Sequence, residues 1–534
     1  MAVPATLPVT SAAEMSQPTS PEGSSDSRPF QMARLGRHTL VYGLASVLAK
    51  AISFVMLPVY TRYLSPADYG VMQLIDMTLD VISIIAGAQV ALGIFRFFHK
   101  AVTNEDRRSI ISTAFLMLAL SYATVGCITL ATSPFISRLV FHTTDYAHLI
   151  RIASTTLALQ GLIAASMAYL RVRNRSLVYV GANFAKLVIG LAFNVIILVG
   201  FGIGVRGVFY SSLIANVVVA AVLGTMLVRD VGLRFATPAA RDLLRYGVPL
   251  IGTQFATFIV TFGDRYFLQG VSNITTVGIY SLAYQFGFLL ASLGYMPFET
   301  VWAPARFEIA KRTDRDEVFS RGFIYMNLLL ISAAVTLTLF INDILRVMAT
   351  PPFYAAASLV PIILVAYVLQ GWSGMQDIGI LVRERTEFVT LGNWLSAVVA
   401  LAGYALLIPR YQGLGAALAT VLAFGVRYGS VYLFSQHLWP VRYRWMPVVR
   451  QIAIAVVICV VGLELPAVNI WLSLGSRALL LLLYAVGVWA LVLSPDDRRA
   501  ARALVARLWA RPTQLFHPAH VLGGEGTLGR GRQP

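Results

Sequence analysis

Charged residues that stand inside long apolar runs are the residues of this sequence best suited to do chemistry. A charge at the centre of a bilayer costs about 2.5–3.5 kcal/mol on insertion scales, so such a residue usually lines a path or has a partner. The basic residues of this kind are predicted to line a cavity for an anionic substrate: Lys50, Lys186, Arg265 and Arg427. The acidic ones are predicted to take part in coupling or to pair with bases: Asp76, Asp80 and Asp264. Asp80 could, for example, neutralise Lys50 on the neighbouring helix.

Several of these charges belong to polar stripes on helical faces. Gln73, Asp76, Asp80, Ser83 and Gly87 recur at steps of three and four residues, so they share one face of a helix. Shorter stripes occur in three other apolar runs: Tyr42, Ser46, Lys50 and Ser53; Gln254, Thr257, Thr261 and Asp264; and Ser281, Gln285 and Ser292, interrupted by Phe288. The uncharged members could equally hydrogen-bond neighbouring helices together. The charged members predict a cavity between helices.

Two adjacent residues of this set are predicted to differ in role. Asp264 and Arg265 are neighbours in sequence, and neighbouring side chains on a helix point about 100° apart. We expect Arg265 to face the central cavity near its outer end, and Asp264 to act as a structural partner or proton site. Lys50 is the strongest candidate for substrate binding because it lies mid-span on a polar stripe. Lys186 and Arg427 could instead face away from the cavity and act structurally.

The elements that must carry these residues are membrane-spanning helices. Of the 534 residues, 57% are hydrophobic and only 13% are charged, whereas soluble domains carry about 25% charged residues. The mean hydropathy is +0.71. These values exclude a soluble enzyme, a nucleic-acid-binding module and a disordered regulator. At about 20 residues per span, the apolar runs predict fourteen helices: Thr39–Tyr60, Val71–Phe98, Ile110–Ala131, His148–Leu170, Val178–Gly200, Gly207–Val228, Tyr246–Leu268, Val277–Pro297, Gly322–Ile341, Ala355–Leu381, Phe388–Ile408, Gly413–Leu433, Val448–Leu465 and Trp471–Leu493.

The net charge of +17 encodes orientation rather than nucleic-acid binding. With the N-terminus inside, the six inner connections contain or abut 20 Lys and Arg residues, against 5 in the seven outer connections. The positive-inside rule then places both termini in the cytoplasm. The Gln269–Thr276 loop is predicted outside, and the Arg306–Arg321 loop inside.

The motifs that would indicate an enzyme do not occur. No connection is long enough for a folded domain, and there is no G-x-x-x-x-G-K-[ST] run for ATP. The sequence has no Cys/His cluster with metal spacing and no serine nucleophile elbow, and its two cysteines, Cys127 and Cys459, lie in apolar runs. Translocation needs only a cavity between helices, so we expect a transporter without catalytic residues, metal or cofactor.

A weak internal repeat relates the two halves. Thr61–Leu64 followed by Gly70 is similar to Asp264–Phe267 followed by Gly278. The two segments are offset by six predicted spans, so both halves enter the membrane in the same direction. Such a parallel repeat is related by an axis along the membrane normal, and the site is expected between the halves.

The same segments resemble a known family. Val59–Gly70 is similar to the "lPlytryLsPadyG" signature of polysaccharide-biosynthesis membrane proteins, and Asp264–Tyr266 with Val277–Tyr284 resembles their second hallmark. These proteins form the O-antigen and exopolysaccharide repeat-unit flippase branch of the multidrug/oligosaccharidyl-lipid/polysaccharide exporter (MOP) superfamily. The resemblance covers roughly residues 36–493.

The resemblance implies two six-helix lobes in a V and alternating access in the bacterial inner membrane. The substrate would be an undecaprenyl-pyrophosphate-linked oligosaccharide, flipped from the inner to the outer leaflet. Lysine can make a point contact with its pyrophosphate, and arginine can fork onto two oxygens. Membrane lipid, a polysaccharide polymerase and glycosyltransferases are the implied partners. In related lipid II flippases a final helix pair is associated with a groove for the lipid tail.

The predicted organisation is an all-α polytopic membrane protein. It comprises a disordered cytoplasmic tail (1–33), an N-terminal six-helix lobe (34–229), a C-terminal six-helix lobe (230–445), an additional helix pair (446–493) and a basic, partly disordered cytoplasmic tail (494–534). Two other functions stay open. A multidrug or cation antiporter of the same superfamily would share the fold, although such antiporters often carry an acid in the first span, where this sequence has Lys50. A membrane-embedded glycosyltransferase or polymerase ranks third, because it usually needs a substantial outer loop.

Overall fold

The computed structural model describes residues 54, 56–465, 470–499 and 502, and every regular element within them is helical. The first half contains α2 (Leu57–Tyr63), α3 (Pro66–Gly87), α4 (Val90–Lys100), α5 (Asn104–Ala131), α6 (Ser133–Phe141), α7 (Ala147–Val172), α8 (Ser176–Val195), the π-helix η1 (Ile196–Gly200) and α9 (Val205–Val231). The second half contains α10 (Thr237–Phe262), α11 (Asp264–Val271), α12 (Ile274–Leu290), the π-helix η2 (Ala291–Tyr295), α13 (Met296–Ile309), α14 (Arg315–Met348), the 3₁₀-helix η3 (Pro351–Ser358), α15 (Val360–Met375), α16 (Ile378–Val382) and α17 (Glu387–Leu438). Two further helices follow, α18 (Trp445–Glu464) and α19 (Ile470–Leu491).

The prediction of an all-helical membrane protein is confirmed. Within the described ranges, eleven helices are long and apolar enough to cross a membrane, or up to twelve if Pro351–Ser358 and Val360–Val382 form one broken span. Helices suit a bilayer because each satisfies its own backbone hydrogen bonds. The total of fourteen stays a prediction. The first predicted span, Thr39–Tyr60 with Lys50, lies mostly outside the described residues, as do the tail 1–33 and most of the tail 494–534.

The 52-residue element α17 consists of two antiparallel helices. Gln412 has φ 48° and ψ −124°, which are not helical angles. The hydroxyl of Ser396 donates to the carbonyl oxygen of Ala423 at 2.7 Å, although 27 residues of straight helix would span about 40 Å. The chain therefore reverses between them. The two arms correspond to the predicted spans Phe388–Ile408 and Gly413–Leu433.

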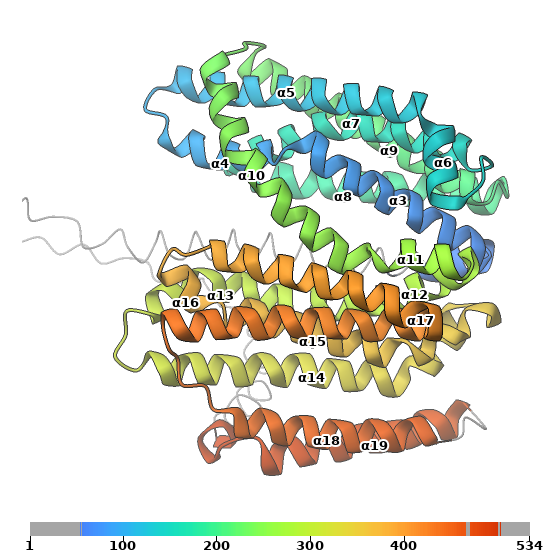
Figure 1. Ribbon diagram of the computed structural model, residues 1–534, viewed down its shortest axis with the longest axis vertical. Helices are drawn as coiled ribbons and strands as arrows, with labels where there is room; N and C mark the ends of the chain where they lie inside the picture. The colour runs from blue at the N-terminus through green and yellow to red at the C-terminus, as the bar shows by residue number, and fades with distance from the viewer. Residues whose placement is uncertain (1–53, 55, 466–469, 500–501, 503–534) are drawn as a thin grey trace, which may run out of the picture.

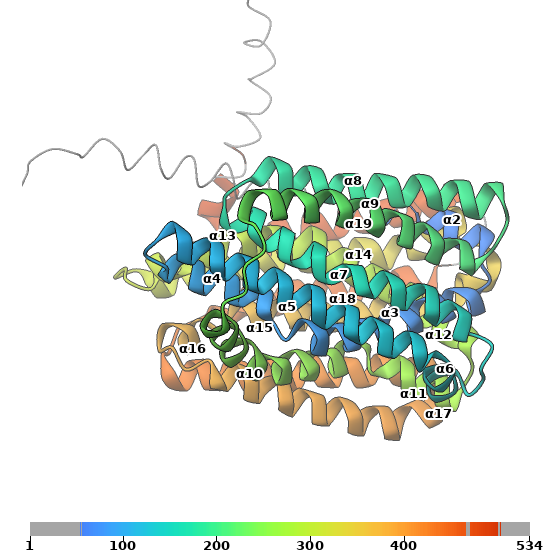
Figure 2. The same cartoon turned by 90° about the horizontal axis from the view of Figure 1, so that it is seen from above.

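The helices form two layers joined by α10 (Figure 1). We call α2–α9 the N-lobe and α11–α17 the C-lobe. The beginning of α10 packs on α4 and α5, whereas its end packs on α17: Gly247 lies against the Ala88 carbonyl, and the Tyr404 hydroxyl donates to the Val260 carbonyl at 3.0 Å. Seen from above, the helices of both lobes run in the same general direction (Figure 2). The pair α18 and α19 packs on α14, on the side of the C-lobe away from the N-lobe.

The first signature segment forms a helix start. Ser65 caps α3, since its hydroxyl accepts from the Asp68 backbone N–H at 3.1 Å, and the Asp68 carboxylate accepts from the Ser65 N–H at 3.2 Å. Pro66 stands in the first turn, where it loses no hydrogen bond. The Ser-Pro-Ala-Asp sequence therefore sets where α3 begins, and with it the register of the polar stripe.

The long helix that follows each motif is interrupted partway. In the N-lobe, α3 and α4 are separated by Ala88 and Gln89, which have φ of 41° and 53°. In the C-lobe, α12 passes through the π-helix η2 before α13. Each interruption lies between the glycine of its signature segment (Gly70 in the N-lobe, Gly278 in the C-lobe) and the end of the bundle that holds the α4–α5 and α13–α14 connections. The halves are thus alike in this detail as well.

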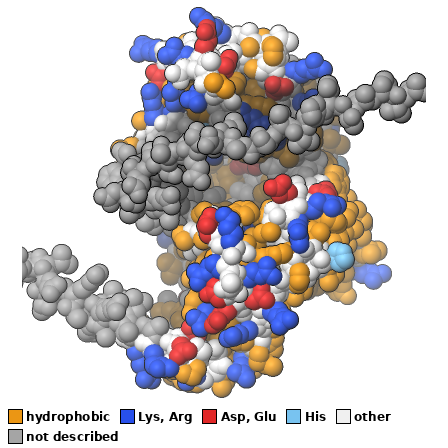
Figure 3. All heavy atoms as spheres, turned by 90° about the vertical axis from the view of Figure 1, so that its left-hand side faces the viewer, with side chains coloured by type: hydrophobic (Ala, Val, Ile, Leu, Met, Phe, Trp, Pro, Cys, Tyr) orange, Lys and Arg blue, Asp and Glu red, His pale blue; other side chains and the backbone are white. Residues whose placement is uncertain are grey.

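Basic side chains gather at one end of the bundle. The α4–α5, α13–α14 and α17–α18 connections lie together at the left-hand end of Figure 1, and Figure 3 shows many Lys and Arg side chains there. We call it the basic end. The α11–α12 connection lies at the opposite, distal end. The two loops predicted on opposite sides of the membrane are therefore at opposite ends of the bundle.

Candidate functional site

The lobes meet at the distal end through backbone-to-backbone packing of α3 on α12. A Cβ atom built on Gly70 would collide with the Ile274 carbonyl oxygen, and one on Gly278 with the Pro66 carbonyl oxygen. Glycine is needed at both positions, because any side chain would push the helices apart. Gly70 and Gly278 therefore allow the two lobes to close tightly at this end.

Hydrogen bonds and an aromatic contact extend this closure. The Thr61 hydroxyl donates to the Met348 carbonyl at 2.6 Å, and the Thr350 hydroxyl donates to the Thr61 carbonyl at 2.9 Å. The ring of Tyr69 meets that of Phe353 edge-on, with centroids 6.1 Å apart. Within the described part of the chain no ion pair joins the two lobes. The closure depends on shape and neutral hydrogen bonds, which can be broken without separating charges.

Two polar cavities lie behind this closure and share two residues. The first, of about 670 Å³, lies within the N-lobe between α3, α8 and α9. The second, of about 430 Å³, lies between the lobes and is lined by α3, α10 and α12. Gln73 and Asp76 line both. We call them the N-lobe cavity and the interlobe cavity.

Part of the α3 stripe, Gln73, Asp76 and Asp80, lines the interlobe cavity. Asp76 and Asp80 lie one helical turn apart on its wall, and Gln285 of α12 and Ser292 of η2 belong to the same lining. Phe288, which interrupts the α12 stripe in sequence, also lines the cavity. Neither aspartate forms an ion pair with a described residue. Among the described residues no group of three or more His, Cys, Asp or Glu side chains could hold a metal ion.

Of the predicted basic residues within the described ranges, Lys186 lines one of these two cavities, and Arg265 and Arg427 line neither. Lys186 lies on the face of α8 that lines the N-lobe cavity, and Asp76 lies in the same lining. No described carboxylate lies within ion-pair distance of its ammonium group. Lys186 is thus available to an anionic ligand.

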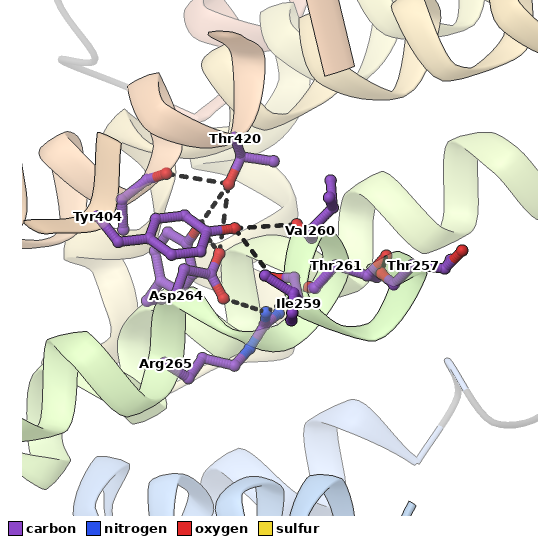
Figure 4. Close-up of polar contacts among 10 residues, drawn as sticks. Thr257, Ile259, Val260, Thr261, Asp264, Arg265, Tyr404 and Thr420 are labelled. Atoms are coloured by element: carbon purple, nitrogen blue, oxygen red, sulfur yellow. Dashed lines mark hydrogen bonds and ion pairs between the residues drawn. The ribbon is translucent and has the colours of Figure 1, made fainter. Parts of the chain in front are cut away.

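Arg265 lines neither of these two cavities, contrary to its expected orientation. Its side chain is fully buried, with 0% exposure, and its Nη1 donates to Asp264 Oδ1 and to the Thr261 carbonyl, each at 2.8 Å (Figure 4). The guanidinium also lies over the Tyr284 ring, 4.0 Å from its centroid. A cation–π contact and a buried carboxylate together replace the water that Arg265 would need.

Asp264 is held by groups from two other helices. Its Oδ2 accepts from the Tyr280 hydroxyl of α12 at 2.5 Å and from the Thr420 hydroxyl of α17 at 3.3 Å. Tyr404 lies nearby and fastens the end of α10 (Figure 4). This geometry agrees with a structural role for Asp264. The α10 hydroxyls of Thr257 and Thr261 donate to their own helix backbone, so most of that stripe is structural.

Arg427 lines neither cavity. Its Nε is buried without a hydrogen-bond partner, and Asp377 and Tyr295 are its electrostatic neighbours. Asp377 itself accepts from Arg306 Nη1 at 2.9 Å, and Glu299 lies 3.7 Å from the same nitrogen. Arg427 therefore belongs to a charged cluster inside the C-lobe, toward the basic end.

The C-terminal helix pair carries its own buried charge pair. Arg477 of α19 donates to Asp343 of α14, and Ser473 donates to the same carboxylate at 3.1 Å. An apolar groove of about 340 Å³ lies between α14, α15 and α18. The polar tether holds the pair against the C-lobe while leaving an apolar surface beside it.

Sequence reasoning missed three cavity residues, Asn183, Asn194 and Asn216. The first two could have been found from their spacing, since Asn183, Lys186, Gly190 and Asn194 recur at steps of three and four on one face of α8. Asn216 has no comparable signal in α9. Lys50 lies outside the described residues, so its predicted place is untested.

Comparisons with known proteins agree with this architecture. A family model described as "Polysaccharide biosynthesis protein" matches residues 35–310, more than half of the chain. No curated protein matches. Among solved structures, the lipid II flippase MurJ in an inward closed conformation has a TM-score of 0.69 at 13% identity, covering 84% of this chain and 97% of that one.

Two further structures show the same fold. An inward-facing multidrug resistance transporter of the MATE family has a TM-score of 0.61 at 16% identity, covering 75% of this chain and 97% of that one. A MOP superfamily transporter from Pyrococcus furiosus has a TM-score of 0.54 at 14% identity, covering 75% and 95%. At such identities the likeness shows the fold. The sequence match shows the family: the chain belongs to the polysaccharide biosynthesis protein family.

Proposed function

We propose that this protein flips an undecaprenyl-pyrophosphate-linked oligosaccharide, an O-antigen or exopolysaccharide repeat unit, across the bacterial inner membrane by alternating access. The observation that carries the proposal is a pair of polar cavities, one within the N-lobe and one between the lobes, that share Gln73 and Asp76 in two lobes that close on each other at one end. A polar headgroup needs such a route because the hydrocarbon core offers it no hydrogen bonds. The family match supports a role in polysaccharide biosynthesis.

The basic end supports an assignment of sidedness. Positively charged connections favour the cytoplasm, so the basic end would face inward and both termini would be cytoplasmic. The Gly70–Gly278 contact would then seal the outer side, and the described conformation would receive substrate from the inner leaflet. Glycosyltransferases would act before this step, and a polymerase would act after it.

Lys186 is proposed to contact the pyrophosphate. It lines the N-lobe cavity and has no ionic partner among the described residues, and a lysine ammonium suits a point contact with phosphate. Lys50 keeps the same proposed role from its place in the sequence. Arg265 and Arg427 would support the C-lobe structurally in this conformation, because each lies away from the cavities.

Asp76 and Asp80 are proposed to couple flipping to a cation or proton. Their carboxylates face the interlobe cavity one turn apart without a basic partner among the described residues. Two such groups repel each other, and a bound cation or proton relieves that repulsion. The apolar groove beside α18 would lie along the polyprenyl chain, which stays in the lipid.

The same two aspartates favour a second candidate, a multidrug or cation antiporter. An acidic wall attracts cationic drugs, and the fold is shared with multidrug transporters. The antiporter hypothesis predicts that Asp76→Asn abolishes resistance to cationic drugs. The flippase hypothesis predicts that drug sensitivity does not depend on this protein.

Accumulation of lipid-linked repeat units tests the proposal directly. In cells that lack the protein, we expect these lipids to collect in the inner leaflet and surface polysaccharide to fall at least tenfold. When Lys186→Gln is expressed in these cells at normal abundance, it should correct little of the defect. Lys186→Arg should restore part of the flipping. If the deletion leaves the distribution of lipid-linked units unchanged, the proposed function is wrong.

A further inference from the structure

Three asparagines line the N-lobe cavity with their amide nitrogens already engaged by the protein. Each Nδ2 donates a hydrogen bond of 2.6–2.9 Å. For Asn183, Asn194 and Asn216 the acceptors are, in order, the Tyr179 carbonyl, the Tyr60 hydroxyl and the Ser212 carbonyl. At least one N–H of each amide is therefore engaged within the lobe.

The carbonyl oxygens of two of these amides have no hydrogen-bond partner. The Oδ1 atoms of Asn194 and Asn216 are buried and accept no hydrogen bond, and these side chains are only 6% and 3% exposed. Buried polar atoms in proteins nearly always have partners, so each such atom calls for a ligand or water. Asp76, on the same cavity wall, adds a carboxylate that has no ionic partner among the described residues. This part of the wall is rich in hydrogen-bond acceptors.

Asn194 and the lysine lie at different depths. Along α8, Asn194 follows Lys186 by eight residues, or about 12 Å of helix, in the direction of the distal end. A ligand that places an anion at Lys186 therefore reaches Asn194 with the group attached to that anion. In a lipid-linked oligosaccharide the attached group is the first sugar.

We propose that Asn194, Asn216 and Asp76 form a glycan subsite that takes a sugar rich in O–H and N–H donors, such as a neutral or N-acetylated hexose, and rejects a uronic acid at that position. This inference deepens the proposed function and depends on it. Sugar hydroxyls can donate to these free acceptors, whereas a carboxylate would face Asp76 and two amide oxygens. The cavity of about 670 Å³ is within the usual size range of ligand sites.

Gly190 offers a way to fill the cavity without disturbing the fold. A Cβ atom on this residue would meet only the Ala215 Cβ, at an ordinary 3.8 Å, and Gly190 lines the cavity. Gly181 lies on the same helix with nothing within 4 Å of its Cβ position and outside both cavity linings. Gly190→Leu and Gly181→Leu are therefore a test variant and its matched control.

The test measures binding of three lipids to the full-length protein in nanodiscs: bare undecaprenyl pyrophosphate, the same lipid bearing N-acetylglucosamine, and the same lipid bearing glucuronic acid. For the wild type and Gly181→Leu, we expect the N-acetylglucosamine lipid to bind at least tenfold tighter than the bare lipid, and the glucuronic acid lipid to show no such gain. In Gly190→Leu, Asn194→Leu and Asn216→Leu the tenfold ratio should fall to about one.

Two safeguards exclude a folding artefact: three different cavity variants are compared, and each is measured only if the purified protein is monodisperse. Asn393→Leu, which alters a buried asparagine of the C-lobe that also has an unbonded Oδ1, should keep the ratio. An unchanged ratio in the three cavity variants, or a glucuronic acid lipid that binds as tightly as the N-acetylglucosamine lipid, would overturn the inference and leave the proposed function standing. Failure of the wild type to bind any of the three lipids would overturn both.

Discussion

Gly70 and Gly278 contact each other's helices reciprocally. A Cβ on Gly70 would strike the carbonyl oxygen of Ile274, four residues before Gly278, and a Cβ on Gly278 would strike that of Pro66, four residues before Gly70. Such mutual contacts arise when two equivalent helices cross about a two-fold axis. The weak repeat in the sequence therefore marks the axis of the molecule, and its glycines form the centre of the lobe contact.

The first prediction concerns this contact. Gly70→Val or Gly278→Val should force the lobes apart at the distal end, because the new side chain meets rigid backbone; overpacking of this kind costs about 1–3 kcal/mol. The population should shift toward an outward-open state. In a background without Cys127 and Cys459, Gln73→Cys should then react at least threefold faster with an impermeant maleimide added outside.

Gly181→Val is the matched control, since its Cβ would enter open space. Equal labelling rates in Gly70→Val and the control would show that the glycine contact does not limit opening.

The second prediction concerns the buried pair of Asp264 and Arg265. Asp264→Asn leaves the guanidinium without its countercharge and should destabilise the protein by about 3–5 kcal/mol. The melting temperature in detergent and membrane abundance should both fall, more than substrate affinity does. The double variant Asp264→Leu/Arg265→Met should recover part of the loss, since it buries no unpaired charge.

Substrate affinity is the measurement that separates this structural role from a binding role. If Asp264→Asn abolished lipid binding while keeping the wild-type melting temperature, a structural role for Asp264 would be ruled out.

The third prediction concerns Lys50, which the sequence places mid-span on a polar stripe. Lys50→Gln should lose flipping at normal membrane abundance, and Lys50→Arg should keep part of it, because a phosphate contact needs the charge more than the shape. Surface polysaccharide and membrane abundance are measured together. Normal flipping in Lys50→Gln, or a defect that only reflects lost protein, would exclude a pyrophosphate contact.

The fourth prediction concerns topology. Reporter fusions should place the Gln269–Thr276 loop outside the inner membrane and the Arg306–Arg321 loop inside, as their opposite ends in the bundle and the positive-inside rule require. Both termini should report a cytoplasmic location. Detection of the two loops on the same side would contradict the orientation.

Local features of the site could be read from the sequence because they depend on one helix at a time. The capping segment at Ser65 and Asp68 sets the register of α3, and helical periodicity then puts Gln73, Asp76 and Asp80 on one face. That face lines the cavities. Lys186 stands in an apolar run, where a charge is costly in lipid, and it lines the N-lobe cavity.

By itself, the sequence determined that this is a helical membrane protein with two related halves, because a bilayer demands long apolar helices and their polar exceptions stand out. Only the tertiary structure decided which charges meet the cavity. Arg265 turns inward because Tyr284 and Asp264 surround it, and Asp264 is held in turn by Tyr280 from another helix. The rotation of each helix about its axis is set by packing against its neighbours, and periodicity within one helix does not contain that information.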